Sequence, residues 1–362
     1  MTAPTLKTTP LHAEHFRLGA RMVDFGGWHM PVQYSGIMDE HHAVRKAAGL
    51  FDISHMGQFI AEGAGAASWL DSMLTNRVAK LGVGQGHYTF LLNAAGGVID
   101  DLIVYRTGET EFLLIVNASK IEEDFAWLDA HRVEKASLWD RSKAFAGFAL
   151  QGPQAEAILR QVYCDSFEPP ARNAICGAGA GTLVARTGYT GEDGFEIFPR
   201  AEDAAMWWNR ILEIGAPLGL KPCGLGSRDT LRMEMCYPLN GNDLSPVRTP
   251  LVAGLGMFVD LTKENFIGRD VLVAQKEQGL GERLAAIRTL EKGAPPRAHY
   301  GVWKDGAQIG ELCSGTLSPS LELGIGLAYL PLAFATPGTA VEIDVRGRRL
   351  AAVVEKKPLY RK

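Results

Sequence analysis

The sequence has few cysteines, and their arrangement excludes two classes of cross-linked or metal-held domain. Only five cysteines occur in 362 residues, and no two of them form a C-x-x-C pair. An odd number of scattered cysteines predicts neither a disulfide framework nor a zinc knuckle. We therefore expect reduced thiols and a cytoplasmic location.

Excess charge and long hydrophobic runs are also missing. A net charge of −4 gives no electrostatic signature of binding to nucleic acid or to an anionic membrane surface. Charge or glycine interrupts every apolar run before the ~20 residues that a membrane-spanning helix needs. Residues 1–10 also lack the apolar run of about 7–15 residues of a signal peptide. We expect no nucleic acid and no membrane among the partners.

The remaining composition is that of a globular protein with more than one domain. With 46% hydrophobic residues the chain can bury a large core, and 362 residues are too many for one ordinary core. Periodic apolar patterns predict helices at 39–48, 119–130, 154–162, 207–214 and 225–234. After a boundary near 255–260, short β-rich runs between Gly and Pro turns predict a small barrel or sandwich; they are 284–290, 307–313, 324–330 and 340–345.

Local signals predict how several of these segments begin and end. The glycine- and aromatic-rich stretch 19–31 indicates a loop pinned by aromatic packing. Gly49 is expected to end the helix at 39–48, and a strand should follow at 50–56. Ser119 is expected to cap the helix at 119–130 in a capping box, and Ser227 can cap the helix at 225–234.

A hairpin predicted between residues 88 and 105 carries the first unusual acids. Gly96 and Gly97 permit a tight turn, and the β-branched run after them predicts a strand. Asp100 and Asp101 point to opposite faces of this strand, and both faces are apolar. A carboxylate among apolar groups costs several kcal/mol unless it is paired, which favours ligand binding. The alternative is an edge strand with one solvated aspartate and one bonded to turn amides.

A second acid lies in an apolar strand after a glycine-rich turn at 188–194. The turn itself is weak evidence, because such sequences also occur as plain hairpins. Glu196 alternates with aromatic and aliphatic residues, so it also needs a partner. Arg228 and Arg232 are four residues apart on one predicted helix face, so at least one must find an anion. Pairing of Arg228 with Glu196 is the simplest hypothesis.

Three histidines, His41, His42 and His55, lie close together in the sequence. Their spacing fits no zinc pattern, because adjacent histidines point to different sides of a helix. We expect capping or packing roles and no metal site.

Eight stretches of the sequence form an ordered set between residue 15 and about residue 330. They read A-R-M-V-D-F-G-G-W from Ala20, E-H-H-A-V-R from Glu40, G-L-F-D-I-S-H-M-G from Gly49, G-G-V-I-D-D-L-I-V-Y from Gly96, L-Q-G-P from Leu150, G-Y-T-G-E-D-G-F-E-I from Gly188, G-L-G-S-R-D-T-L-R from Gly224 and S-G-T-L-S-P-S-L from Ser314. Together they resemble the T-protein of the glycine cleavage system, an aminomethyltransferase that uses tetrahydrofolate. The set covers most of the chain, so it is far more specific than any single motif.

The resemblance implies an α+β fold. Its three domains form a ring of antiparallel sheets with flanking helices, and the C-terminal domain is a β-barrel or jelly-roll-like structure. The implied domains are 1–50 with 141–255, then 51–140 carrying the central aspartate, and 260–362. Folate would lie in a central channel.

The resemblance also implies roles for individual residues. Asp100 matches the catalytic aspartate and Glu196 the glutamate that binds the pteridine, while Arg228 matches an arginine of the substrate region. The folate site would further be lined by Asn117, Met56 and Tyr88. A pterin offers amide and amine donors that a buried carboxylate can accept, which would give Glu196 its partner.

The implied reaction takes an aminomethyl group from the dihydrolipoyl arm of the H-protein. Ammonia leaves, tetrahydrofolate receives the carbon, and 5,10-methylenetetrahydrofolate forms. No protein nucleophile is required. Basic residues such as Arg297 and Lys292 are expected to steer an acidic carrier protein.

Two positions depart from the family's usual pattern: Cys236, where a glycine is more common, and Asn240, where a tyrosine is more common. A tyrosine that the family carries near the C-terminus is not assigned to Tyr360. Two other functions stay open. One is a folate-dependent demethylase that acts on another one-carbon donor. The other is a non-enzymatic folate-binding protein of iron–sulfur metabolism, whose K-G-C-Y-x-G-Q-E motif is matched here only by Cys236 and Tyr237.

Overall fold

The computed structural model describes residues 5–164 and 166–362, which divide into two compact units. Unit 1 takes the described residues up to Asp71, Val78–Tyr88 and the described residues of Leu102–Asp229. Unit 2 takes Ser72–Arg77, Thr89–Asp101 and Thr230–Lys362. Each unit combines segments that are distant in the sequence.

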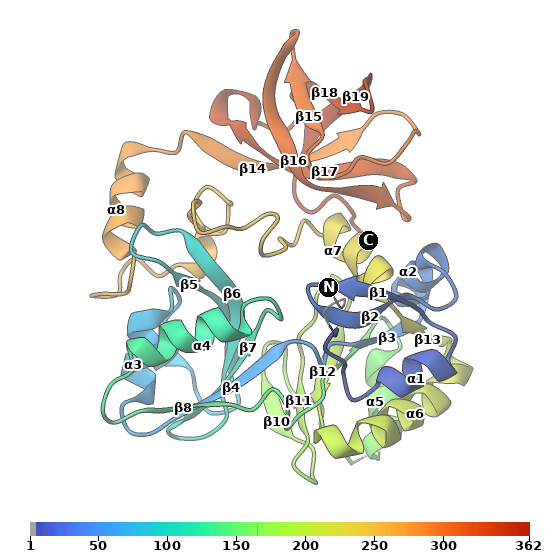
Figure 1. Ribbon diagram of the computed structural model, residues 1–362, viewed down its shortest axis with the longest axis vertical. Coiled ribbons are helices and arrows are strands. Elements are labelled where there is room, and N and C mark those ends of the chain that lie inside the picture. The colour runs from blue at the N-terminus through green and yellow to red at the C-terminus, as the bar shows by residue number, and fades with distance from the viewer. Residues whose placement is uncertain (1–4, 165) are drawn as a thin grey trace. The chain divides into compact units, whose positions relative to one another are not determined.

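Unit 1 contains a six-stranded sheet with the strand order β10-β11-β12-β9-β3-β13 (Figure 1). Its strands are β3 (Ala48–Asp52), β9 (Phe148–Gln151), β10 (Ile175–Gly177), β11 (Leu183–Ala185), β12 (Gly194–Phe198) and β13 (Leu220–Cys223). Neighbours run antiparallel, except that β13 runs parallel to β3. Every residue of β3, β9 and β12 is buried, so a polar side chain on these strands must be satisfied inside the protein.

Helices pack on this sheet, and side chains from both the helices and the strands form the core of unit 1. They include α1 (His12–Arg17), α2 (Ile37–Lys46), α5 (Ala155–Tyr163) and α6 (Ala204–Gly215). The buried positions of α5 recur at the three- and four-residue spacing of an amphipathic helix; they are Ala155, Ile158, Leu159 and Val162. This stripe packs with Trp208 and Ile211 of α6 against Phe148 and Leu150 of β9.

A five-stranded sheet has the order β5-β6-β7-β4-β8. Its strands are β4 (Gly57–Glu62), β5 (Gly86–Leu92), β6 (Val98–Arg106), β7 (Glu111–Val116) and β8 (Ser137–Asp140), with helices α3 (Ala66–Met73) and α4 (Ile121–Ala130) connecting them. The C-terminal end of β5, the turn after it and the N-terminal end of β6 belong to unit 2, because this unit takes Thr89–Asp101.

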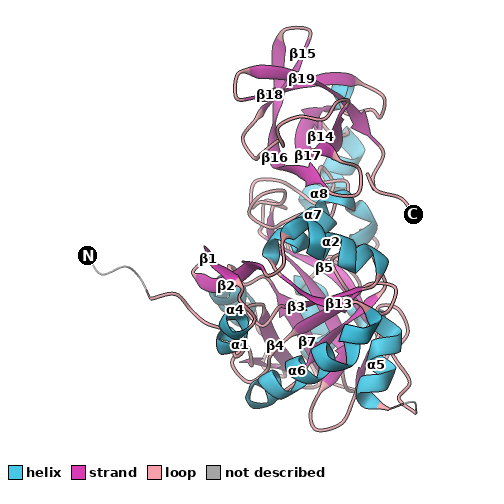
Figure 2. Ribbon diagram, turned by 90° about the vertical axis from the view of Figure 1, so that its right-hand side faces the viewer, coloured by secondary structure: helices cyan, strands magenta, loops and turns pink. Residues whose placement is uncertain are grey.

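Unit 2 contains a closed barrel with the order β14-β17-β16-β15-β18-β19, in which β19 pairs back onto β14 (Figure 2). The strands are β14 (Glu282–Thr289), β15 (Gly301–Lys304), β16 (Ala307–Ser318), β17 (Leu323–Pro331), β18 (Ala340–Val345) and β19 (Arg348–Glu355), preceded by helices α7 (Leu225–Glu234), whose first half belongs to unit 1, and α8 (Arg269–Gln278). Alternate aliphatic residues such as Ile287, Leu312 and Ile343 fill the barrel interior.

The tip of the β5–β6 hairpin is held inside unit 2 by contacts with residues 245–248. Gly96 has φ +78°, the left-handed conformation that its turn requires. A Cβ on Gly97 would lie 1.8 Å from the carbonyl oxygen of Pro246, so no other residue fits there. The Asn93 side chain donates to that oxygen at 2.8 Å, and the Val98 amide donates to the Ser245 carbonyl at 3.0 Å.

The structure confirms the α+β class and the C-terminal barrel, and it corrects four local expectations. The stretch expected to be a loop at 19–31 forms the hairpin β1 (Arg21–Phe25) and β2 (Trp28–Gln33), with its turn at Gly26 and Gly27. Gly49 lies inside β3 instead of ending α2, whose C-cap is Ala47. Lys120 and not Ser119 precedes α4, and no side chain caps it.

The fourth correction concerns Ser227, which is inside α7 and not at its start. Its hydroxyl lies within hydrogen-bond distance of two acceptors, the Gly224 carbonyl at 2.9 Å and Glu40 Oε2 at 3.1 Å. A serine hydroxyl that bonds back to a carbonyl three residues earlier is compatible with the helix interior. In the described part of the chain, no helix has the length and apolarity needed to cross a membrane.

Candidate functional site

Glu196 occupies the middle of the six-stranded sheet of unit 1. It lies on β12 opposite Ala185 of β11 and Ala149 of β9, and it is only 6% exposed. Thr187 Oγ1 donates a hydrogen bond to Glu196 Oε2 at 2.6 Å. No hydrogen bond to Oε1 occurs within the described residues. One carboxylate oxygen is therefore left for another donor.

Burial raises the pKa of Glu196 above its usual range. The hydrogen bond from Thr187 and the charge of Arg228 oppose this shift. Desolvation disfavours the charged form, whereas a donor or a nearby cation favours it. Burial is the largest of these effects, so the net shift of the Glu196 pKa is upward.

Arg228 lies in the first turns of α7, above the ring of Tyr189. Its guanidinium carbon is 4.9 Å from the ring centroid. It closes no ion pair with Glu196 or with any other described residue, and its buried Nη1 has no hydrogen-bond partner among them. Burial lowers the pKa of Arg228, while the charge of Glu196 counteracts this effect. A buried guanidinium nitrogen without an acceptor is expected to bind one from a ligand.

Met56 and Asn117 flank two paired strands at one end of the five-stranded sheet. Met56 directly precedes Gly57 of β4, Asn117 directly follows Val116 of β7, and Gly57 pairs with Val116. Both residues are half-buried. Tyr88, also half-buried, is the last residue of β5 that belongs to unit 1.

His55, for which the sequence predicts a capping or packing role, directly precedes Met56. It is 5% exposed, and its ring lies 5.9 Å from that of Phe25 and 6.5 Å from that of Trp28. Its Nδ1 has no hydrogen-bond partner among the described residues. Burial and the charge of Arg228 lower the pKa of His55 to about 4, although Asp52 opposes them. The imidazole is neutral at physiological pH.

The glycine-rich turn at 188–194 is fixed by side chains from other elements. Gln151 Nε2 donates to the Thr187 carbonyl at 3.0 Å, and Thr190 Oγ1 donates to Gln151 Oε1 at 2.9 Å. Arg45 Nη1 binds the Thr190 carbonyl at 2.7 Å and Glu192 at 2.9 Å. The turn therefore holds Thr187 and Tyr189 in place beside Glu196 and Arg228.

Asp100 belongs to unit 2, as does Asp101. Asp100 is fully buried on β6, whereas Asp101 is half-buried. The Asn240 side chain donates to the carbonyl of the preceding Ile99 at 3.3 Å. The two aspartates therefore differ in exposure, a distinction that strand alternation between two apolar faces did not predict.

The predicted site residues thus fall in two groups. Glu196 and Arg228 interact electrostatically in unit 1, and Arg228 also acts on His55, the neighbour of Met56. Asp100 lies in unit 2. Sequence reasoning missed Thr187, Tyr105 and Tyr189. Tyr105 and Tyr189 lie within two of the quoted motifs, and Thr187 directly precedes the second of these.

Arg232 forms an ion pair with a buried carboxylate, as expected for at least one of the two arginines. Its Nη1 lies 2.6 Å from Asp243 Oδ2 in unit 2, with side-chain exposures of 3% and 0%. Ser314 Oγ and the Leu239 amide donate to the same oxygen, each at 2.9 Å. This network joins α7 to the barrel strand β16 and leaves Arg232 no capacity for a ligand acid.

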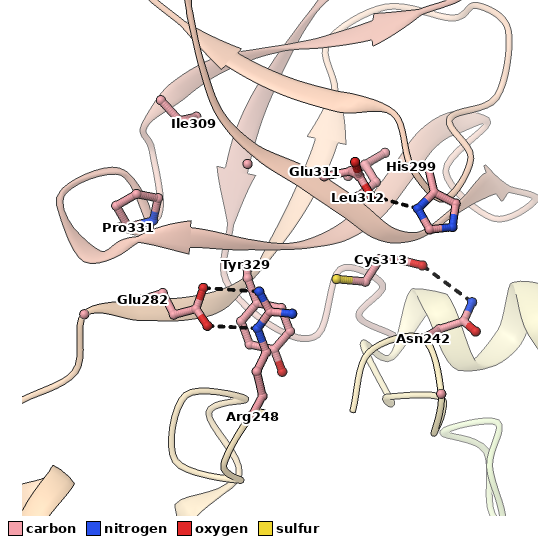
Figure 3. A pocket seen from close by; sticks show the side chains of 13 residues that line it. Asn242, Arg248, Glu282, His299, Ile309, Glu311, Leu312, Cys313, Tyr329 and Pro331 are labelled. Atoms are coloured by element: carbon pink, nitrogen blue, oxygen red, sulfur yellow. Dashed lines mark hydrogen bonds and ion pairs between the residues drawn. The ribbon is translucent and has the colours of Figure 1, made fainter. Parts of the chain in front are cut away.

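A cavity of about 510 Å³ lies on the barrel of unit 2, with Tyr329 and Cys313 in its wall (Figure 3). Arg248 stacks over the Tyr329 ring at 4.0 Å and binds Glu282 at 2.8 Å. Two further titratable residues of the wall, His299 and Glu311, contact each other at 2.8 Å. The ionisable side chains of this wall thus contact one another, whereas Arg228 Nη1 in unit 1 has no acceptor among the described residues.

No group of three or more His, Cys, Asp and Glu side chains in the described residues could hold a metal ion. His41 and His42 stack edge to face, with ring centroids 5.6 Å apart.

The polar groups of unit 1 suit a flat, polar aromatic ligand. Glu196 offers an acceptor oxygen, Arg228 offers a donor, and Tyr189 offers an aromatic ring beside Arg228. Such a set of a few convergent polar groups beside aromatic surface is typical of small-molecule sites.

Comparisons with known proteins agree over nearly the whole chain. Residues 11–263 match a family model described as the GCVT N-terminal domain, and residues 283–361 match one described as the glycine cleavage T-protein C-terminal barrel domain. Aminomethyltransferases from Bacillus mycoides and from Bacillus cereus are each 46% identical over 363 residues, with 99% of both chains covered.

A solved structure is similar in fold over the same length. The crystal structure of glycine cleavage system aminomethyltransferase T from Bartonella henselae superimposes with a TM-score of 0.92 at 33% sequence identity. The match covers 98% of each chain.

Proposed function

The chain belongs to the glycine cleavage T-protein family of aminomethyltransferases, and from this premise we propose its donor, its acceptor and its site residues. The donor is the aminomethyl group on the dihydrolipoyl arm of the H-protein. The acceptor is tetrahydrofolate, and the products are ammonia, 5,10-methylenetetrahydrofolate and the free dithiol arm. The reaction belongs to glycine catabolism in the cytoplasm.

One observation carries the choice of ligand: two complementary polar atoms in unit 1 lack partners. Glu196 Oε1 has no donor and Arg228 Nη1 has no acceptor within the described residues. A reduced pterin presents N–H donors and a carbonyl acceptor in one plane, so it can satisfy both atoms. Bonds of this kind to charged groups are about twice as strong as neutral ones. Tetrahydrofolate supplies the nitrogens that receive the one-carbon unit.

Met56, Asn117 and Tyr88 complete the folate site in this proposal. Met56 offers apolar surface, and Asn117 and Tyr88 offer polar groups at positions with partial access to solvent. The neutral His55 next to Met56 keeps a second positive charge away from Arg228.

Asp100 is the proposed catalytic residue. Its carboxylate orients the amines of the folate and stabilises positive charge that develops at the transferred carbon. A fixed charge in a site without water acts strongly on such a transition state. Its complete burial supports this role.

The cysteines have no role in the proposed reaction. Burial raises the pKa of Cys176, Cys223, Cys236 and Cys313, so these thiols are protonated and poor nucleophiles. We also propose the three-domain division into 1–50 with 141–255, 51–140 and 260–362.

The proposal is tested in two steps. Calorimetric titration or thermal shift with tetrahydrofolate should show binding, and no response well above micromolar concentration would remove the central claim. Transfer activity is then measured with lipoylated H-protein and with free methylated amines as donors. Activity with H-protein alone is expected. Activity with the free amines alone would indicate a demethylase, and binding without any activity would indicate an accessory folate-binding protein.

A further inference from the structure

We propose that Tyr105 and Thr187 are positioning residues that orient Glu196 and hold one of its oxygens, so that the other oxygen is presented to the ligand. This inference rests on the proposed function, in which Glu196 binds the folate. It assigns a role to two residues that make no proposed contact with the ligand themselves.

The three side chains form a chain of hydrogen bonds inside unit 1. Tyr105 Oη lies 2.8 Å from Thr187 Oγ1, and Thr187 Oγ1 donates to Glu196 Oε2 at 2.6 Å. A threonine hydroxyl has one proton, which it gives to the carboxylate. The tyrosine must therefore donate to the threonine, and the proton order is Tyr105 to Thr187 to Glu196.

Each member of the chain is fixed by a different element. Tyr105 on β6 is fully buried, and its ring fills the space that Gly86 on β5 leaves open, since a Cβ there would lie 2.2 Å from the ring. The Thr187 carbonyl is held by Gln151 Nε2 at 3.0 Å. Glu196 is fixed by strand pairing on both sides. The carboxylate thus has little freedom to rotate.

The direction of the chain also controls the charge of Glu196. A carboxylate only accepts hydrogen bonds, so a hydroxyl that donates to it favours the ionised form. Tyr105 strengthens the effect, because hydrogen bonds in a chain polarise one another. Ionisation matters for the ligand, since a hydrogen bond from a ligand N–H to a charged carboxylate is about twice as strong as one to a neutral acceptor.

The alternative is that the two hydroxyls only satisfy each other in the interior. In that case their loss lowers stability and leaves the pH dependence of ligand binding unchanged. Burial opposes ionisation of Glu196, so the pH at which binding is lost reports directly on the donor at Oε2. This pH distinguishes positioning from packing.

The experiment measures the dissociation constant of tetrahydrofolate by calorimetry between pH 5 and 8 for the full chain and a set of variants. Thr187→Val should weaken binding by about 10- to 100-fold near neutral pH, the effect expected for a lost bond to a charged group. It should also move the loss of affinity to higher pH. Thr187→Ser keeps the hydroxyl, so its affinity near neutral pH and the pH at which affinity is lost should both stay close to those of the wild type. Tyr105→Phe should shift the profile in the same direction by less.

Two matched controls remove hydroxyls that have no connection with Glu196. Thr289→Val removes a buried threonine hydroxyl in the barrel that donates to the Glu291 carbonyl at 3.0 Å. Tyr163→Phe removes a tyrosine hydroxyl of unit 1 that has no partner among the described residues. Both should keep the wild-type pH profile.

The outcomes separate this inference from the proposed function. If the wild type does not bind tetrahydrofolate, the proposed function fails. If it binds, and Glu196→Gln abolishes the pH dependence while Thr187→Val keeps the wild-type profile, only the positioning role is overturned. If Thr187→Val does not fold, Tyr105→Phe decides, and a wild-type profile in that variant overturns the inference.

Discussion

Two arginines of one helix show two different uses of a buried carboxylate. In unit 2, Arg232 contacts Asp243 Oδ2 at 2.6 Å, and Ser314 and Leu239 also donate to that oxygen. In unit 1, Arg228 interacts with Glu196 only at longer range, and Glu196 accepts one hydroxyl from Thr187. In the first, closed pair the charged groups are in direct contact through Asp243 Oδ2, although Asp243 Oδ1 has no hydrogen-bond partner among the described residues. In the second, open pair the charged groups form no ion pair, and Arg228 Nη1 has no acceptor among these residues.

The difference teaches how one sequence pattern can serve structure and binding. Breaking a closed buried ion pair leaves an uncompensated charge, which is strongly destabilising. An open pair contributes less to folding, because each charge is compensated poorly in the free protein. A ligand can donate a hydrogen bond to Glu196 and accept one from Arg228. Stability and binding are therefore expected to respond oppositely to substitutions in the two pairs.

The largest effect on stability is expected from Arg232→Leu. It removes the direct ion pair with Asp243 in the interior and should lower the free energy of unfolding by about 3–5 kcal/mol. The matched variant Arg228→Leu should cost clearly less, because Arg228 forms no ion pair with a described residue. Urea unfolding of both variants measures this. Equal losses would show that the two pairs do not differ as described.

Asp100 sharpens the comparison, since it is a fully buried acid proposed to act on the transition state. Asp100→Asn should lower kcat by at least about 100-fold, because one preorganised electrostatic contact is worth ~2.7–4 kcal/mol. The fold and much of the folate affinity should persist. The matched variant Asp101→Asn should leave the rate nearly unchanged.

Steady-state kinetics with H-protein and saturating folate measure both variants. A normal rate in Asp100→Asn together with an inactive Asp101→Asn would mean that the wrong aspartate was chosen.

Glu196→Gln tests the open pair through ligand binding. The amide keeps the shape but loses the charge, so tetrahydrofolate should bind about 1.5–3 kcal/mol more weakly. In unit 2, Asp243→Asn should instead lower stability and leave folate affinity within about twofold, since its partners are all internal. Calorimetry and urea unfolding of both variants complete the cross-comparison. A Glu196→Gln variant with unchanged affinity would contradict the site.

The stability of the free protein should also depend on pH through Glu196. Burial raises its pKa above the usual 4.5. The folded state then binds more protons than the unfolded state between 4.5 and the raised value, so this group's contribution to stability falls as pH rises through that window. Glu196→Gln should lack this fall. The measurement is the unfolding free energy of the wild type minus that of Glu196→Gln, taken across this pH window. If this difference rose with pH, the raised pKa would not belong to Glu196.

The smallest effect is expected at the protein surface, outside both pairs. Arg297 is exposed and has no ion pair among the described residues, whereas Lys292 already pairs with Glu322. Arg297→Glu should slow association with an acidic H-protein roughly two- to fivefold at low salt, and Lys292→Glu should do less. Stopped-flow rates at several salt concentrations measure this. A rate independent of salt would argue against steering.

Helices and strands with regular apolar patterns could be predicted from the sequence. The predictions were wrong where tertiary contacts determine the local structure. Amphipathic spacing located α5, and alternating β-rich runs located most of the barrel. The hairpin at 21–33 was missed, because glycines that suggest a loop instead form its turn. Gly49 was assigned to a helix end, but it lies in β3, where Val44 and Cys223 leave no room for a side chain.

The candidate site could be predicted only in part, for a related reason. Glu196 was identifiable as a polar residue in an apolar strand, and at least one of Arg228 and Arg232 was expected to need an anionic partner. Which acid each arginine meets depends on distant segments, so neither Asp243 nor the open state of Arg228 could be read from spacing. Cys236 was noted as a departure from a usual glycine, and its φ of +59° now gives the reason for that glycine.

The contacts of the β5–β6 turn have a consequence for the order in which the chain is made. Asn93 binds the carbonyl of Pro246, which is 153 residues further along. At about 5–20 residues per second, a ribosome needs on the order of 8–30 s to supply that partner. During this time the hairpin at Thr89–Asp101 cannot form its contacts with residues 245–248. This early segment of unit 2 therefore completes its packing only after the later segment has been synthesised. Until then, the segment Thr89–Asp101 lacks contacts that hold it within unit 2.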